Sequence, residues 1–344
     1  MSLLRRKRIL SSIRIVEKHI RSAITIVHKE VKVCHSLLTA DFFKPCLHQC
    51  IYCYGSFIAY AMPPPGVYEL YVNRPKLIKR FMEKHSTLKY PIRIGALSNV
   101  SHPKAMDLLA ETLEYAAEVE YPIVLFTKTL VHKHPRLEHA MRVLADKGLF
   151  DIEVTITTMK PELAKKLEPK APPPSERVKI LEWAKDHGIP FQLRVSPVFQ
   201  GLTDSEEHFR DVLESTPKSH VIVEYVRAKG RVKEYLESLG VSPWETFPDW
   251  GRYSLAPISY RREGYLRLRS VAHKLGWSFA VCGDKHFKIS DKPDCCCVGF
   301  YVKFMHMYKT SPEYSKAINN FIELVLPATP LYRWKGPDHN LAAP

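Results

Sequence analysis

Short apolar runs alternate with longer amphipathic segments through the middle of this 344-residue chain. The run at 122–127 is almost entirely apolar, as is typical of a strand buried on both faces, and the run at 151–157 repeats the pattern. Strands are predicted at 91–97, 122–127, 151–157, 191–196 and 220–226. Helices are predicted at 74–85, 103–119, 135–147, 160–167, 175–187 and 205–215. Strands that alternate with helices of about 10–15 residues indicate parallel βα units.

Six such units, counting the loop at 46–54 as the end of the first, predict an α/β fold built on a partial (βα)6 barrel at 35–228. In barrels the site residues gather at the carboxyl ends of the strands. The alternation changes at 229–344, where we expect a smaller α+β extension. Its predicted elements are a helix near 230–239, an aromatic loop, a helix near 262–275 and a strand at 277–282.

The first 34 residues are expected to form a basic helix followed by a lead-in strand. Ile9, Ile13, Val16 and Ile20 are separated by four, three and four positions, which places them on one face of an amphipathic helix over 1–23. Such a helix packs on the main domain or serves as a nucleic-acid arm. The β-branched residues of 24–37 then favour extended structure that leads to the cysteine loop.

The formal net charge of +15 bears on which partners the protein could bind. It favours association with phosphates, nucleic acid included, and is equally expected of a lysine-rich solvated surface. No run of about 18 apolar residues is present, so we expect no membrane span. The chain start lacks the apolar core of a secretory signal. The eight cysteines are clustered, which fits metal ligation in a reducing cytoplasm better than a disulfide framework, and we expect a cytoplasmic protein.

Three cysteines, Cys46, Cys50 and Cys53, have the spacing C-x3-C-x2-C in one short loop. A four-iron cluster has four corners, so three thiolates leave one iron open to chemistry, whereas electron-transfer clusters normally use four cysteines. The alternative is a zinc site that takes His48 or a distant cysteine as its fourth ligand.

This spacing resembles the signature of the radical S-adenosylmethionine (radical SAM) superfamily. Further segments resemble its spore photoproduct lyase-like branch, often labelled "DNA repair photolyase". They lie at 46–54, 93–99, 126–129, 154–158, 167–172 and 197–204. The resemblance implies a [4Fe–4S] cluster, bound SAM, and reductive cleavage of SAM to a 5′-deoxyadenosyl radical that abstracts hydrogen from a substrate. It also implies an electron donor of the flavodoxin or ferredoxin type.

The resemblance assigns roles to residues at the strand ends. Cys46, Cys50 and Cys53 would ligate the cluster. Tyr52 and Tyr54 match tyrosines implicated in packing against SAM and in hydrogen or electron relay, and ordinary aromatic packing explains them equally well.

Five further residues are expected at the SAM site. Lys128 resembles the lysine that contacts the SAM carboxylate, although a lysine there can also snorkel to the rim. Ser98 and Asn99 would face SAM, where the branch usually has Asp in place of Asn99; an amide forms hydrogen bonds but carries no charge. Thr155 is similar to a strand-borne hydroxyl near SAM. Arg194 lies mid-strand, where it binds a carboxylate bidentately or points outward.

One departure from the branch limits the expected reaction. The photoproduct lyases place a hydrogen-donating cysteine in the segment that matches 95–99, and this chain has Gly-Ala-Leu-Ser-Asn there. Either another group, such as Tyr52 or Tyr54, quenches the product radical, or the substrate is not a DNA dimer. We favour the second alternative.

A second cysteine group lies near the end of the chain and contains Cys282, Cys295, Cys296 and Cys297, with His286 between them. It is expected to hold an auxiliary iron–sulfur cluster or a zinc ion through Cys282 and two of the three adjacent cysteines, taken as Cys295 and Cys296. A buried turn with free thiols is the alternative.

Three functions remain open at this point. The first is a radical SAM enzyme, lyase-like, that acts on nucleic acid or another acidic molecule, with DNA repair as one setting. The second is a radical SAM enzyme acting on a peptide or small molecule. The third is a non-catalytic, zinc-stabilised nucleic-acid-binding protein. No Gly-rich dinucleotide fingerprint follows a strand, so light-driven flavin chemistry is not expected.

Overall fold

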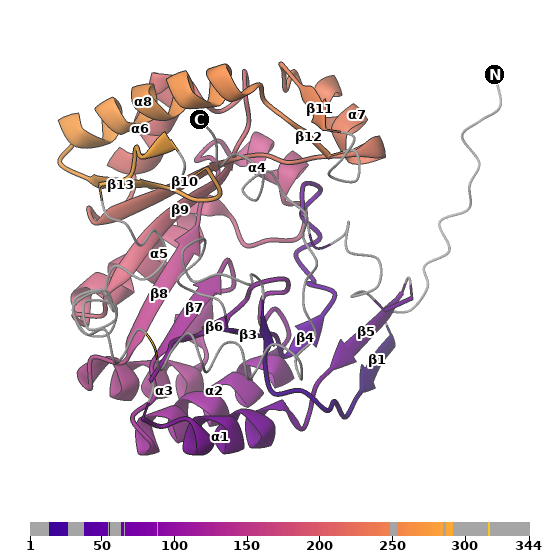
Figure 1. Cartoon of the computed structure of the whole chain (residues 1–344), viewed down its shortest axis with the longest axis vertical. Coiled ribbons are helices and arrows are strands. Elements are labelled where there is room, and N and C mark those ends of the chain that lie inside the picture. The colour runs from indigo at the N-terminus through magenta and orange to yellow at the C-terminus, as the bar shows by residue number, and fades with distance from the viewer. Residues whose placement is uncertain are drawn as a thin grey trace.

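A mostly parallel sheet forms the centre of the computed structural model (Figure 1). The structure describes residues 14–26, 38–53, 55, 63–64, 66–87, 89–247, 253–284, 287–291 and 316. The strand order is β13-β10-β9-β8-β7-β6-β3-β2. The strands that pair in parallel are β3 (Leu38–Ala40), β6 (Ile92–Ile94), β7 (Ile123–Thr127), β8 (Phe150–Thr155), β9 (Phe191–Val198), β10 (His220–Tyr225) and β13 (Ser278–Val281). A short antiparallel strand, β2 (Thr25–Ile26), pairs with β3. The sheet stays open in the described residues, which confirms the predicted α/β partial barrel.

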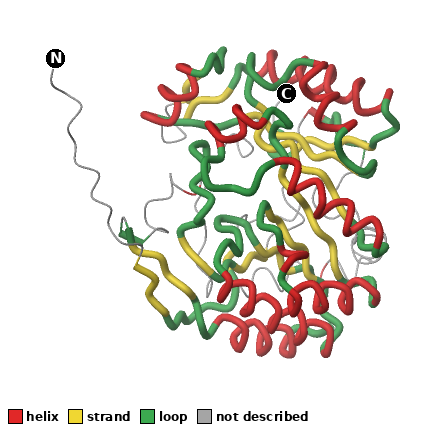
Figure 2. Tube along the Cα trace, turned by 180° about the vertical axis from the view of Figure 1, so that it is seen from behind, coloured by secondary structure: helices red, strands yellow, loops and turns green. Residues whose placement is uncertain are grey.

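Helices cover the outer face of this curved sheet (Figures 1 and 2). They are α1 (Arg74–Lys84), α2 (Pro103–Glu118), α3 (Pro135–Asp146), α5 (Pro174–Asp186), α6 (Glu206–Glu214) and α8 (Ile258–Lys274). Helix α4 (Pro161–Leu167) follows β8 and ends beside the loop at 46–53. The helices α1 to α5 each have a proline in the first turn, where its missing N–H costs nothing. Their bounds agree closely with the predicted helices, because both follow from the 3.6-residue apolar period.

The two faces of the sheet differ in polarity, and this difference positions the site. On β8, Ile152 and Val154 pack in the main core beneath the helices, whereas Asp151, Glu153 and Thr155 alternate onto the concave face. The Asp151 carboxylate accepts a hydrogen bond from Gln192 Nε2 of β9 at 3.0 Å. The concave face therefore presents buried polar groups between the strands.

The predicted helix over residues 1–23 is wrong for its described part. Arg14–Glu17 form strand β1, which pairs in parallel with β5 (Val67–Leu70), and β5 also pairs with β4 (Phe43–Lys44). Backbone hydrogen bonds to β5 outweigh the helical spacing, and Val16 and Ile20 of the predicted apolar face are only half-buried. Residues 1–13 of the predicted helix, and 27–37 of the lead-in strand, lie outside the described residues.

The extension after residue 228 adds a strand to the main sheet. After α7 (Gly230–Ser238) and the pair β11 (Glu245–Phe247) and β12 (Tyr253–Leu255), helix α8 leads to β13, which pairs in parallel with β10. The predicted six-strand series thus gains a seventh parallel strand within the described chain. The divisions at residues 34 and 228 stay predictions.

A buried triad, here called the helix-side triad, secures α8 to the end of β13. The Asp284 carboxylate accepts hydrogen bonds from Arg261 Nε and a second guanidinium nitrogen, both at 3.0 Å, and from the Tyr265 hydroxyl at 2.8 Å. Arg261 also donates to the carbonyl of Ala256 at the start of the helix. None of the described helices is long and apolar enough to cross a membrane.

Candidate cluster and cofactor site

The cysteine loop follows β4 and lies across the carboxyl ends of β6 and β7. Leu47 donates its backbone N–H to Ser101 Oγ at 2.9 Å, and Cys46 Sγ lies 3.8 Å from the same hydroxyl. His48 Nε2 lies 3.3 Å from Thr129 Oγ1, just after β7. These contacts place Cys46 and the start of the loop at the strand ends, where a barrel carries its site.

A second set of contacts ties the same loop to the segment after α4. The Ile51 N–H donates to the Leu167 carbonyl at 3.0 Å, and the Lys170 N–H donates to the His48 carbonyl at 3.2 Å. The Tyr52 hydroxyl donates to the buried Glu168 carboxylate. Hydrogen bonds therefore attach the cysteine loop both to the residues that follow β6 and β7 and to the segment that follows α4.

Burial raises the pKa of the Cys46 thiol and raises that of Cys50 to about 11, with the Lys128 charge opposing the second shift. A positively charged metal centre stabilises such thiolates, which are its ligands. No three His, Cys, Asp or Glu side chains of the described residues converge on a point that could hold one metal ion. The Cys46 thiol lies near enough to Cys50 and Cys53 for their charges to interact, as is expected of ligands of one cluster in which each thiolate binds a different iron.

The structure brings Asn99, Lys128 and Tyr52 together beside the cysteine loop. Asn99 Oδ1 accepts the Lys128 backbone N–H at 2.6 Å, and Lys128 Nζ lies 5.6 Å from the centre of the Tyr52 ring. A carboxylate oxygen would accept the same bond, so this structural role does not need the aspartate that the branch usually has. Ser98 is buried, and its hydroxyl lies 3.4 Å from the Asn99 carbonyl.

Thr155 ends β8, and Arg194 is its partner in register on β9. Arg194 faces the concave side, not outward: its guanidinium donates to Glu153 Oε2 at 2.8 Å and lies 4.8 Å from the centre of the Phe126 ring. Burial raises the pKa of Glu153, and Arg194 opposes that shift. The structure thus joins Arg194 to Glu153 and places Thr155 at the strand end.

The second cysteine group is only partly described. Cys282 follows β13 and donates its backbone N–H to Val223 at 2.9 Å. Close to it, burial raises the pKa of Glu224 to about 7, with Arg227 opposing. Cys295, Cys296, Cys297 and His286 lie outside the described residues, as does Tyr54. A second metal centre stays a prediction.

Sequence reasoning missed Glu168 and Arg177. Arg177 donates to Glu168 Oε2, and both side chains are buried. We call Tyr52, Glu168 and Arg177 the cluster-side triad. Burial raises the pKa of Glu168, but Arg177, Lys128 and Tyr52 outweigh it and hold that pKa below its usual value. One signal was available: Arg177 shares the apolar face of α5 with Leu181 and Ala184, and a charge there requires a buried partner.

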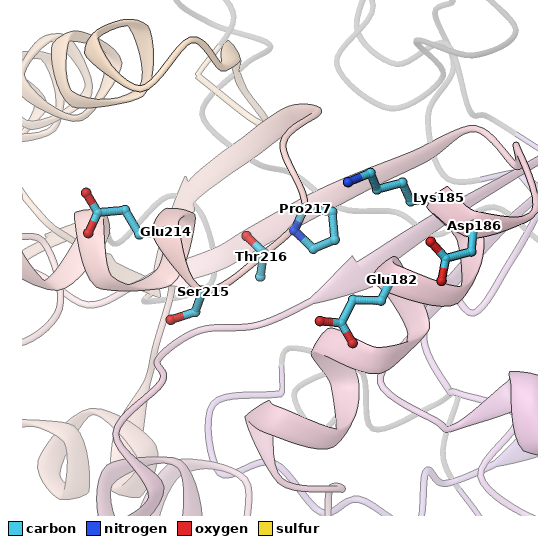
Figure 3. A pocket seen from close by; sticks show the side chains of 7 residues that line it. All are labelled: Glu182, Lys185, Asp186, Glu214, Ser215, Thr216 and Pro217. Atoms are coloured by element: carbon cyan, nitrogen blue, oxygen red, sulfur yellow. The ribbon is translucent and has the colours of Figure 1, made fainter.

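A cavity of about 440 Å³ lies elsewhere, between the carboxyl-terminal ends of α5 and α6 (Figure 3). Its lining residues are Glu182, Lys185, Asp186, Glu214, Ser215, Thr216 and Pro217. These helix ends precede the amino ends of β9 and β10, so the cavity lies at the opposite edge of the sheet from the cysteine loop. It contains none of the predicted site residues.

An open parallel barrel with three cysteines at its carboxyl edge is the arrangement expected of a radical SAM enzyme, and comparison with known proteins agrees. The family model of the radical SAM superfamily matches residues 42–214, just over half of the chain. The chain therefore belongs to the radical SAM superfamily and is a radical SAM enzyme, which implies a [4Fe–4S] cluster and SAM.

The matches to individual proteins described next are at low sequence identity. Uncharacterized protein ORF301 of Acidianus two-tailed virus is 23% identical over 219 residues, which cover 58% of this chain and 70% of that protein. A cysteine-to-serine mutant of spore photoproduct lyase matches the fold with a TM-score of 0.60 at 15% identity, covering 78% of this chain and 81% of that one. A mutant of the same lyase with bound AdoMet and dinucleoside spore photoproduct matches with a TM-score of 0.58 at 14% identity over the same shares. The fold is thus that of spore photoproduct lyase.

Proposed function

We propose that this enzyme cleaves SAM reductively at a [4Fe–4S] cluster on Cys46, Cys50 and Cys53 and abstracts hydrogen from a nucleic-acid substrate. One observation carries the proposal: the three-cysteine loop, which contains Tyr52, lies beside Asn99 and Lys128 at one edge of the sheet. When bound, the cluster and SAM supply a 5′-deoxyadenosyl radical, and the protein binds, orients and shields them.

The side chains around the loop divide this work. The Lys128 ammonium is placed to attract the SAM carboxylate, since it lies near both Cys50 and the Tyr52 ring. Asn99 and Ser98 shape the backbone turn that faces the cofactor, and Thr155 offers a hydroxyl at the end of the neighbouring strand. Arg194, paired with Glu153, serves this site by ordering the concave face. Tyr52 and Tyr54 pack against the cofactor or relay hydrogen and electrons.

Nucleic acid is the proposed substrate because the chain carries a net charge of +15. The matching lyase is described in complex with a dinucleoside photoproduct. The repair of a thymine dimer by the usual route is not part of the proposal, because positions 95–99 contain no thiol. Position 95 also has no room for a cysteine side chain: Gly95 has φ +87°, and a Cβ there would lie 2.1 Å from the Phe126 carbonyl oxygen.

That missing thiol supports a second candidate, a radical SAM enzyme that acts on a peptide or small molecule. Retention on DNA or RNA that falls steeply with salt concentration would favour a nucleic-acid substrate over a peptide or small molecule, because binding to the phosphates of nucleic acid releases counterions. A flavodoxin- or ferredoxin-type protein is the proposed reductant. A second metal centre at Cys282 with Cys295 and Cys296, and a cytoplasmic location, complete the proposal.

Anaerobic reconstitution followed by dithionite and SAM tests the main proposal. We expect a brown protein with about four irons and the release of 5′-deoxyadenosine. The C50A variant is the control and should lose both. A wild-type protein that holds the cluster yet leaves SAM intact under reduction contradicts the proposal. Deuterium transfer from labelled nucleic acid into 5′-deoxyadenosine then identifies the substrate class.

A further inference from the structure

The Glu168 carboxylate is buried and fully occupied by groups from three separate segments. One oxygen accepts the Tyr52 hydroxyl of the cysteine loop and Thr157 Oγ1, the latter at 3.1 Å. The other oxygen accepts a guanidinium N–H of Arg177 from α5. Such a buried network orders all of its members, because a lost partner would leave a buried charge.

Arg177 extends the network to the end of β8. Its second terminal nitrogen donates to the Thr155 carbonyl at 2.7 Å. The cluster-side triad therefore connects the loop that carries the cysteines to the strand end where Thr155 is expected to meet SAM. The two backbone bonds between the loop at 46–53 and the segment after α4 run alongside this connection.

We propose that Glu168 and Arg177 are positioning residues that hold the cysteine loop at a fixed place relative to the end of β8. This inference rests on the proposed function. It assigns a role to a segment, residues 167–170, that contributes no cluster ligand.

The E168Q variant tests this inference, and D284N is the matched control because Asp284 holds the same kinds of partner in the helix-side triad. Amide hydrogen exchange, measured with and without the cluster, should become about tenfold faster or more at 46–53 and 167–170 in E168Q. In D284N the increase should fall on α8 and β13 instead.

A further readout concerns SAM cleavage. Misplacement of the loop should lower the kcat for 5′-deoxyadenosine by about tenfold or more and change the KM for SAM less, because the cofactor contacts of Lys128 and Asn99 remain. Unchanged exchange in the loop in E168Q overturns the inference. If E168Q does not fold, Y52F removes one hydrogen bond of the same network and should also speed exchange in the loop; unchanged exchange in Y52F overturns the inference equally. A wild-type protein without a cluster defeats the proposed function, while the exchange result still decides the positioning role.

Discussion

The cluster-side triad and the helix-side triad contain the same chemistry: a buried carboxylate, a fully buried arginine and a tyrosine that donates its hydroxyl. They differ in what they connect. Glu168 joins the cysteine loop to helix α5 and the end of β8, whereas Asp284 joins a 17-residue helix to the end of a strand already paired with β10. Under the proposed function, the same group of interactions supports a reaction site in one place and only the fold in the other. Backbone context makes the difference, since loops without a hydrogen-bond ladder depend more on their side chains.

Removing the arginine from each triad should have the largest effect. R177M and R261M each leave a carboxylate buried without its partner, at a cost of about 3–5 kcal/mol in the free energy of unfolding. Urea denaturation checks this expectation. Only R177M should also lose iron after reconstitution under conditions where it is folded. Equal loss of iron in R261M would contradict the distinction between the triads.

Removing the tyrosine hydroxyls should have a smaller effect. Y52F and Y265F each delete one hydrogen bond to a charged carboxylate, worth about 1.5–3 kcal/mol, and leave the ring packing intact; Y265F also removes the acceptor of the Tyr225 N–H. The free energy of unfolding should therefore fall at least as much in Y265F as in Y52F, while SAM cleavage falls only in Y52F. A comparable loss of activity in Y265F would show that global stability, not position, governs the reaction.

A variant of Lys128 tests the functional side of the comparison between the two triads. K128M removes the ammonium near Cys50 and should raise the KM for SAM about tenfold, because a charge-assisted contact to the SAM carboxylate is lost. Lys133 is the matched control, since it lies nearby after β7 and pairs with Glu176 at the surface. K133M should leave the KM unchanged. An unchanged KM in K128M would remove this lysine from the site.

The smallest expected effect concerns Asp291, on the side of the molecule that contains the helix-side triad. Partial burial raises its pKa, but hydrogen bonds from His273, the Phe279 N–H and Arg269 outweigh this and hold the pKa below its usual value. A depressed carboxylate pKa adds stability above the unfolded value near 3.8, and this is lost as the pH falls through the folded pKa. D291N should therefore cost about 1 kcal/mol at pH 7, and the difference from wild type should shrink as the pH falls below about 4. A difference that is constant with pH would argue against this coupling.

Much of the fold could be predicted from the sequence because its elements are long and periodic. Strands 123–127 and 150–155 and the helices between them follow from local patterns that tertiary contacts only reinforce. Strand β1 could not be predicted in this way. It has four residues, and its partner β5 begins about 50 positions later, so the pairing that decides its conformation is absent from the local pattern.

The candidate site shows the same limit. Cysteine spacing and the polar residues after β6 and β7 indicated the loop, Asn99 and Lys128, because strand ends of a parallel sheet meet at one edge. Glu168 was missed because its bond to Tyr52 spans 116 positions, and nothing near either residue specifies the other. Arg194 was predicted as a cofactor ligand without its neighbour Glu153, since cross-strand pairs depend on register.

The pairing of β13 with β10 has a consequence for how the chain can be divided. A fragment that ends near residue 228 would keep all the predicted site residues before Cys282 but would leave one edge of β10 without its partner. The apolar side chains of Val221 and Val223, buried in the intact chain, would then flank a row of unsatisfied amides and carbonyls. Such a truncated protein should aggregate through this exposed edge, so β13 protects the part of the chain that contains the predicted site even if it never touches a substrate.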